Sequence, residues 1–154
     1  MLAAGAMAPG VEGIDQHGAP FRLSDLRGRW VILYFYPMDE TLGCTAEACA
    51  FRDDWESLRM MGAEVVGVST QGPESHRKFA EHHRLPFRLV ADPEKRIART
   101  YDVLGLLGLA RRVTYLVDPE GRIRDAYRSE VNPTSHIERA KKLLRELGAK
   151  QQSF

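Results

Sequence analysis

An uninterrupted apolar run near the start of the chain limits the folds that it can adopt. Residues 30–36 read WVILYFY, so β-branched or aromatic side chains occupy both the odd and the even positions. A strand with one solvated face alternates apolar and polar residues, whereas a strand buried on both faces does not. We therefore expect this run to be the central strand of a sheet that is covered on both sides.

Shorter apolar runs follow, and segments with helical spacing separate them. Further strands are predicted at residues 64–69, 87–90, 113–117 and 123–127, the last two joined as a hairpin through the turn 118–121. Helices are predicted at residues 45–61, 73–83, 93–101 and 133–147, the last ending at Gly148 as its C-cap.

This order of elements predicts an α/β protein with a thioredoxin-like fold, in which helices flank a mixed central β-sheet on both faces. The 154 residues show no composition break long enough to act as a linker. We therefore expect a single domain over residues 1–154, with its core at about 20–148.

The charge balance does not favour a nucleic acid or an acidic membrane as partner, because 22 Lys and Arg face 21 Asp and Glu. The opening MLAAGAMAPG lacks the cationic region of a signal peptide, and no apolar stretch is long enough to span a bilayer. These features predict a cytoplasmic protein.

The two cysteines, Cys44 and Cys49, are too few for a disulfide-stapled scaffold, so their positions matter more than their number. Cys44 stands where the loop after the central strand gives way to a helix. The amide protons and dipole of a helix N-terminus stabilise an anion, and the thiolate is the reactive form of cysteine. We expect Cys44 to be partly thiolate, although a buried structural thiol is the commoner role of a lone cysteine.

The residues around Cys44 favour chemistry on a peroxide. Thr41 can present a hydroxyl to the thiolate and to a peroxide oxygen, while Pro37 restricts the preceding loop. Attack on an oxygen–oxygen bond builds negative charge on the departing oxygen, which a fixed cation stabilises. Arg112, at the entry to a later strand, is the candidate cation, with Arg111 as the alternative.

The string FYPMDETLGCTAEACAFRD contains PxxxTxxC followed by CxxxxC, and it closely resembles peroxiredoxins of the bacterioferritin-comigratory or Q type. The resemblance runs from about Phe21 to Leu147. It implies a peroxidase that needs no metal or organic cofactor, with Cys44 as the peroxidatic cysteine. It also implies that Pro37, Thr41, Gly43 and Arg112 complete the pocket that binds a hydroperoxide.

The same resemblance implies roles for two further residues. Glu47 would orient the arginine, although an ordinary exposed acid near a helix N-terminus is an equal alternative. Cys49 would resolve the sulfenic acid of Cys44 as an intramolecular disulfide, which a dithiol such as thioredoxin then reduces. Relatives of this type are often monomers, so a monomer is expected.

Helix geometry limits how the two cysteines can bond. Five residues of regular helix give a rise of about 7.5 Å, which places the two Cα atoms roughly 8–9 Å apart. A disulfide needs a Cα separation of about 4.4–6.8 Å. We therefore expect the helix that carries Cys44 and Cys49 to unwind locally before they bond.

Two other functions are compatible with parts of this pattern. A thiol-disulfide oxidoreductase shares the order of elements, but it uses CxxC rather than CxxxxC. A metal-binding or redox-sensing module would combine Cys44 and Cys49 with some of His76, His82 and His83, in a spacing that matches no usual zinc pattern. We interpret His82 and His83 instead as a solvated face near a helix end.

Overall fold

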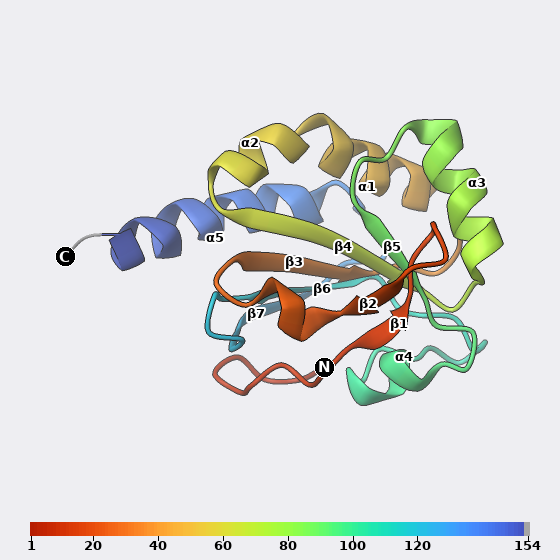
Figure 1. Ribbon diagram of the computed structural model, residues 1–154, viewed down its shortest axis with the longest axis horizontal. Helices are drawn as coiled ribbons and strands as arrows, with labels where there is room; N and C mark the ends of the chain where they lie inside the picture. The colour runs from red at the N-terminus through yellow and green to blue at the C-terminus, as the bar shows by residue number, and fades with distance from the viewer. Residues whose placement is uncertain (153–154) are drawn as a thin grey trace.

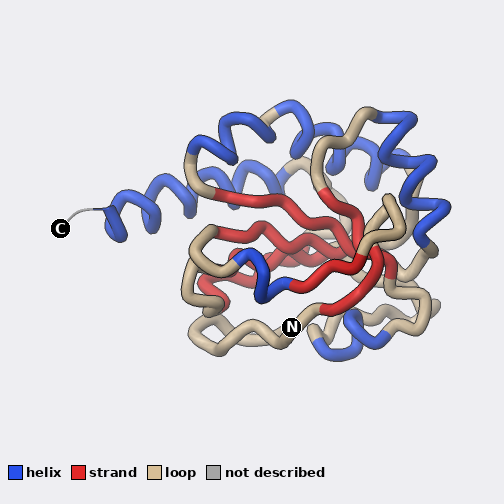
Figure 2. The backbone as a smooth tube through the Cα atoms, viewed as in Figure 1, coloured by secondary structure: helices blue, strands red, loops and turns tan. Residues whose placement is uncertain are grey.

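The computed structural model describes residues 1–152, of which residues 149–152 are described by their backbone alone. A seven-stranded sheet in the order β2-β1-β5-β4-β3-β6-β7 forms its centre (Figures 1 and 2). The strands are β1 (Glu12–Ile14), β2 (Pro20–Arg22), β3 (Trp30–Phe35), β4 (Ala63–Ser69), β5 (Arg88–Ala91), β6 (Val113–Val117) and β7 (Ile123–Arg128). The helices are α1 (Leu42–Asp53), α2 (Trp55–Met60), α3 (Pro73–His83), α4 (Arg96–Thr100), α5 (Ser135–Gln152) and the short 3₁₀ helix η1 (Leu23–Leu26).

Strand β3 is the central strand that its apolar run predicts, and all six of its residues are buried. It runs parallel to β4 and antiparallel to β6, so the sheet is mixed, as predicted. Each of the five predicted strands is present within one residue of its expected bounds. The register pairs Phe35 at the end of β3 with Val113 at the start of β6, which brings residue 112 beside the loop that leaves β3.

The side chains of β3 alternate between two apolar layers, because successive residues of a strand point to opposite faces. Ile32 and Tyr34 pack with α1, α2, α3 and α5 on one face. Leu33 and Phe35 pack with α4 and the N-terminal segment on the other face. The first face is thus covered by longer helices than the second. Figure 1 shows α1, α2 and α3 above the sheet and α4 below it. The predicted thioredoxin-like arrangement with helices on both faces is confirmed.

Three of the four predicted helices have wrong boundaries. The segment 45–61 forms two helices that part at Asp54, and α1 begins at Leu42 because Thr41 caps it with its side chain. Helix α4 begins at Arg96 instead of residue 93, since the Asp92 carboxylate accepts from the first helical amides, at 3.1 Å from Ile97 N and 2.8 Å from Ala98 N. Helix α5 continues through Gly148, where a Cβ atom would meet nothing within 4 Å.

The N-terminal hairpin of β1 and β2 is absent from the sequence-based prediction. Each of these strands has three residues, too few to reveal a two-residue period. Their connection is a tight turn in which the Asp15 carboxylate accepts from His17 N at 2.8 Å and Ala19 N at 3.1 Å. The hairpin joins the sheet through a single pairing of Ile14 with Ala91.

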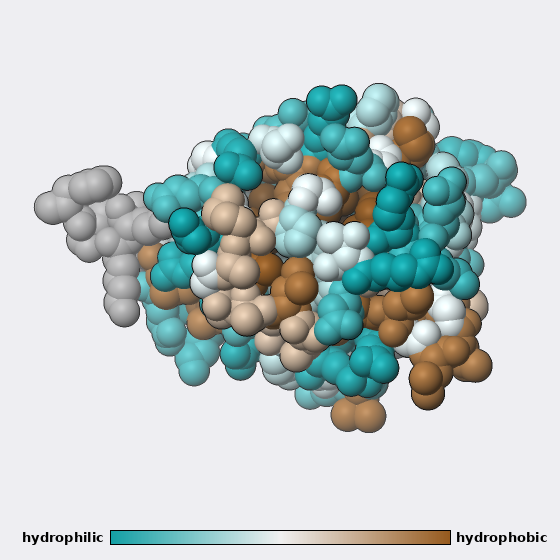
Figure 3. Space-filling view, turned by 90° about the horizontal axis from the view of Figure 1, so that it is seen from below, coloured by the Kyte–Doolittle hydropathy of each residue, from teal (hydrophilic) through white to brown (hydrophobic). Residues whose placement is uncertain are grey.

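The surface seen from below the sheet carries separate hydrophobic groups among hydrophilic side chains (Figure 3). None of the helices in the described part of the chain is both long enough and apolar enough to cross a membrane.

Gly67 tests the tight packing between the sheet and the layer that carries α1. A Cβ atom at this position would lie 2.9 Å from Leu89 Cδ2 and 2.9 Å from Tyr34 Cζ, in the middle of the sheet. We expect Gly67→Ala to lower the free energy of unfolding by about 1–3 kcal/mol through overpacking. Urea denaturation measures this loss, with Gly10→Ala as control, because nothing lies within 4 Å of a Cβ there. Equal stability of the two variants would contradict this packing.

Candidate active site

Cys44 lies in the first turn of α1, which follows the loop that leaves β3. Its side chain is 1% exposed and belongs to the apolar layer on that face. Its backbone amide donates to Thr41 Oγ1 at 3.3 Å, which caps the helix. The Thr41 hydroxyl in turn donates to the Met38 carbonyl at 3.3 Å. Thr41 therefore bonds the backbone of the loop and of the helix. That its hydroxyl is also presented to the thiolate and to a peroxide oxygen stays a prediction.

Arg112 is the cation that reaches this sulfur. Its Nη2 lies 3.4 Å from Cys44 Sγ, and its Nη1 donates to Glu47 Oε1 at 2.8 Å. The planar fork of a guanidinium allows one side chain to make both contacts at once. Arg112 is 5% exposed, whereas the neighbouring Arg111 is half-buried. The pairing of β3 with β6 places Arg112 here, because Val113 is the residue opposite Phe35.

Glu47 lies one helical turn beyond Cys44 and is 1% exposed, so its interpretation as an ordinary exposed acid is wrong. Burial raises the pKa of Glu47 to about 8, and the charge and hydrogen bond of Arg112 oppose that shift. Its second oxygen, Oε2, has no hydrogen-bond partner in the described structure and lies 3.7 Å from His136 Nδ1. Glu47 is thus positioned to hold the Arg112 guanidinium in place.

His136 of α5 lies beside this cluster, and no pattern in the sequence identifies it. Its Nε2 lies 3.0 Å from the Ser129 carbonyl, which only accepts, so Nε2 carries the proton. Burial lowers the pKa of His136, which keeps the ring neutral and makes Nδ1 an acceptor for the Thr114 hydroxyl at 2.8 Å. The sequence does not identify His136, because it belongs to a helix that is distant in sequence from Cys44 and Glu47.

The loop from β3 to α1 is anchored by Asp39, which sequence reasoning also missed. The Asp39 carboxylate accepts from Tyr36 Oη at 2.6 Å, from Ser75 Oγ at 2.7 Å and from His76 Nδ1 at 2.7 Å. Although burial by itself raises it, the hydrogen bond and charge of His76 hold the pKa of Asp39 below its usual value. His76 therefore bonds the Asp39 carboxylate of this loop and does not join the cysteines in a metal site.

Two further predicted residues lie near Cys44 in the chain. A Cβ atom on Gly43 would lie 3.0 Å from Arg112 Nη2, so this position lets the guanidinium approach the helix closely. Pro37 is half-buried and opens the loop after β3.

Cys49 lies on the same helix as Cys44 and is half-buried, and both thiols are free. Because α1 is helical from Leu42 to Asp53, the two Cα atoms are separated by about 8–9 Å of regular helix geometry. That separation exceeds the limit of about 6.8 Å for a disulfide. The two sulfurs cannot bond while the first turns of α1 remain intact.

Comparison with known proteins finds similarity along most of the chain. A model of the AhpC/TSA family matches residues 4–126. "Peroxiredoxin Q, chloroplastic" of Sedum lineare is 44% identical over 135 residues, which cover 86% of this chain and 73% of that protein. "Peroxiredoxin Bcp" of Bacillus subtilis (strain 168) is 40% identical over 154 residues, covering 95% and 97%. The crystal structure of peroxidoxin BcpB from Mycobacterium tuberculosis is similar with a TM-score of 0.89, at 36% identity, covering 96% and 99%.

The raised pKa of Glu47 links the stability of the chain to pH. The carboxyl has a pKa of 4.5 in the unfolded chain and about 8 in the folded chain. At a pH between these two pKa values, Glu47 therefore takes up a proton when the chain folds. This contribution to stability is fully present below pH 4.5 and is lost as the pH rises towards about 8. We expect Glu47→Gln to remove this decline, because glutamine does not titrate.

Urea unfolding across this pH range measures the effect, with both proteins carrying Cys44→Ser so that no thiol titrates beside Glu47. Parallel curves of stability against pH, with and without Glu47→Gln, would show that burial does not shift the pKa of this carboxyl.

Proposed function

The chain belongs to the AhpC/TSA family as a peroxiredoxin of the Q/Bcp type and is a thiol peroxidase, and we propose that Cys44 is its peroxidatic cysteine. The observation that carries this proposal is the contact of 3.4 Å between Cys44 Sγ and Arg112 Nη2 at the start of α1. The helix N-terminus and the guanidinium both stabilise a thiolate at this position. The buried apolar surroundings strengthen these electrostatic interactions.

The first step transfers one oxygen atom from the hydroperoxide to sulfur. The Cys44 thiolate attacks the terminal oxygen, so a sulfur–oxygen bond forms while the oxygen–oxygen bond breaks. Cys44 becomes a sulfenic acid, and the departing alkoxide or hydroxide takes a proton from water to leave as an alcohol or as water. Arg112 stabilises the negative charge that moves from sulfur to the departing oxygen, and Glu47 keeps the guanidinium in position through its bond of 2.8 Å.

Thr41, Gly43 and Pro37 support this step through the backbone. Thr41 caps α1 and so orders the amide of Cys44, which lies 3.3 Å from its hydroxyl oxygen. Gly43 leaves room for Arg112 to approach the helix, and Pro37 restricts the loop that leads to Thr41. We propose that these three residues, with Arg112, form the hydroperoxide site.

The second step forms a disulfide between Cys44 and Cys49. The Cys49 thiol attacks the sulfenic sulfur, a sulfur–sulfur bond forms, and the hydroxyl leaves as water with the thiol proton. Both cysteines belong to α1, so its first turns unwind before this reaction. Peroxiredoxins of this family are reduced by thioredoxin-like proteins, and we propose that thioredoxin itself returns this disulfide to two thiols by thiol exchange.

The proposed disulfide forms within one chain, which supports a monomeric enzyme. Both reacting sulfurs come from one helix, so the cycle needs no second copy. We propose that residues 1–154 act as one monomeric domain. The cytoplasmic location stays a prediction, since one of the relatives above is chloroplastic.

Substitution of each cysteine separates the two steps. We expect Cys44→Ser to abolish hydroperoxide consumption, because serine is not nucleophilic at neutral pH. We expect Cys49→Ser to keep the first oxidation but to accumulate sulfinic and sulfonic acids at Cys44, since no thiol resolves the sulfenic acid. Peroxide consumption and mass spectrometry of both variants measure these outcomes. A normal, sustained cycle in Cys49→Ser would refute its role as the resolving cysteine.

Arg112→Lys keeps the positive charge but removes the fork that contacts sulfur and carboxylate together. We expect the rate constant for oxidation of Cys44 to fall roughly tenfold to hundredfold, because one ammonium cannot occupy both positions. Stopped-flow measurement under single-turnover conditions provides this constant. Arg111→Lys is the matched control, since Arg111 is adjacent and half-buried. An equal loss in both variants would argue against the assignment of Arg112.

A further inference from the structure

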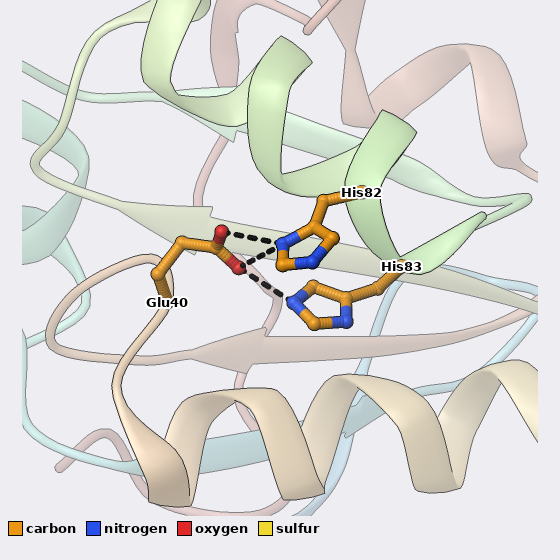
Figure 4. A group of neighbouring side chains, drawn as sticks. All are labelled: Glu40, His82 and His83. Atoms are coloured by element: carbon orange, nitrogen blue, oxygen red, sulfur yellow. Dashed lines mark hydrogen bonds and ion pairs between the residues drawn. The ribbon is translucent and has the colours of Figure 1, made fainter.

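Three side chains with metal-binding groups meet between the loop that precedes α1 and the C-terminal end of α3 (Figure 4). Glu40 Oε2 lies 2.7 Å from His82 Nδ1, and Glu40 Oε1 lies 2.5 Å from His83 Nε2. The ligand atoms of the three residues all lie within 4.8 Å of one another. Among residues 1–148, whose side chains the structure describes, no other group of three His, Cys, Asp or Glu converges in this way.

Packing holds the His83 imidazole in place, and the exposed His82 ring rests on it. His83 is 18% exposed in its side chain, and its ring meets that of Phe79 edge-on at 5.2 Å. The ring of His82 lies against that of His83, with centroids 4.1 Å apart. The sequence-based interpretation of both residues as a solvated face is therefore wrong for His83. A ligand group that is already positioned loses little conformational entropy on binding an ion.

The loop presents its carboxylate through an unusual backbone conformation. Glu40 has φ 68°, in the left-handed region that costs energy for a residue with a Cβ atom. Figure 4 shows its side chain reaching from the loop towards the two imidazoles. Its two oxygens make three contacts of 2.5 to 3.1 Å with the rings.

The donor set matches a divalent transition metal rather than Mg²⁺ or Ca²⁺. Imidazole nitrogen suits Zn²⁺, Cu²⁺ and Ni²⁺, and two histidines with one glutamate form a known three-ligand Zn²⁺ set with water as the fourth ligand. A tetrahedral ion at about 2.0–2.2 Å from each atom separates the ligands by about 3.3–3.6 Å. In the structure the facing nitrogens donate to the Glu40 carboxylate. When an ion binds, the carboxylate oxygens have to move away from these nitrogens by roughly 1 Å, and each ring then carries its proton on its other nitrogen.

The local charges permit a cation here. His82 and His83 form the last turn of α3, where the helix dipole favours positive charge, and Glu40 supplies a negative one. A nearby cation, Arg52, donates to the His83 carbonyl at 2.8 Å, and its guanidinium is itself paired with Asp53 at 3.0 Å.

We propose that Glu40, His82 and His83 form a binding site for a divalent transition-metal ion of the Zn²⁺ class. Glu40 lies four positions before Cys44, so a bound ion ties the loop that leads into α1 to the end of α3. The ion therefore opposes the unwinding of α1 that brings Cys44 to Cys49. This consequence rests on the proposed function, whereas the binding of the ion does not.

Titration calorimetry with Zn²⁺ tests the site in full-length protein carrying Cys44→Ser and Cys49→Ser, because free thiols also bind zinc. We expect one ion per chain, and an affinity at least about tenfold weaker after His82→Gln, His83→Gln or Glu40→Gln. His82 is 65% exposed in its side chain, so His82→Gln does not disturb the core. His17→Gln, at an exposed histidine elsewhere, is the matched control and keeps full affinity. Absence of Zn²⁺ binding, or equal affinities of His82→Gln and His17→Gln, would overturn the proposal.

A second measurement tests the effect on the disulfide. Reduced protein with both cysteines receives one equivalent of hydrogen peroxide with and without Zn²⁺, and the disulfide is quantified over time by mass spectrometry. We expect Zn²⁺ to slow disulfide formation at least about fivefold in the native sequence and in His17→Gln, but not in His82→Gln, through the coupling of binding to conformation. An equal slowing in His82→Gln would overturn the link to α1. Failure to consume peroxide without Zn²⁺ would instead refute the proposed function, and the calorimetry would stand.

Discussion

The guanidinium of Arg112, the residue before β6, links that strand to Cys44 and Glu47 of α1. It contacts Cys44 Sγ at 3.4 Å and Glu47 Oε1 at 2.8 Å, in a layer that otherwise consists largely of apolar side chains. A buried charge of this kind is tolerated only where its partners are in place, since an unpaired ion in the interior is very costly. The pairing of Phe35 with Val113 sets the position of Arg112, so the site depends on the register of two central strands.

In the proposed cycle, helix α1 has to be ordered for the oxidation of Cys44 and locally unwound for the disulfide with Cys49. Its later part is anchored in the core by Ala48 and Phe51, which are both fully buried. Its first turn carries Leu42, which is 93% exposed, and begins at the Thr41 cap. Unwinding of that turn therefore breaks few apolar contacts of Leu42, although it withdraws the buried Cys44. Segments with few buried contacts are the ones that open most readily in a native protein.

The loop before α1 is held on two sides by the same helix, α3. Asp39 binds His76 near the first turn of α3 at 2.7 Å, within the protein interior. Glu40, the next residue, binds His82 and His83 at the other end of α3, near the surface. Two adjacent acids thus connect the loop to both ends of one helix. The buried contact of Asp39 with His76 holds the loop that leads to Cys44. The contact of Glu40 with the two histidines near the surface is the proposed ion site.

Local patterns were enough to predict the buried strands, the hairpin turn and the place of Cys44 after the central strand, because apolar runs and turn residues express local preferences. The role of Arg112 came from its motif and its resemblance to a family. The burial of Glu47 on Arg112 and the contact of Asp39 with His76 became visible only in the folded chain, since these pairs are 65 and 37 residues apart. Burial and pairing of such distant residues follow from how the sheet and helices pack, which no local pattern records.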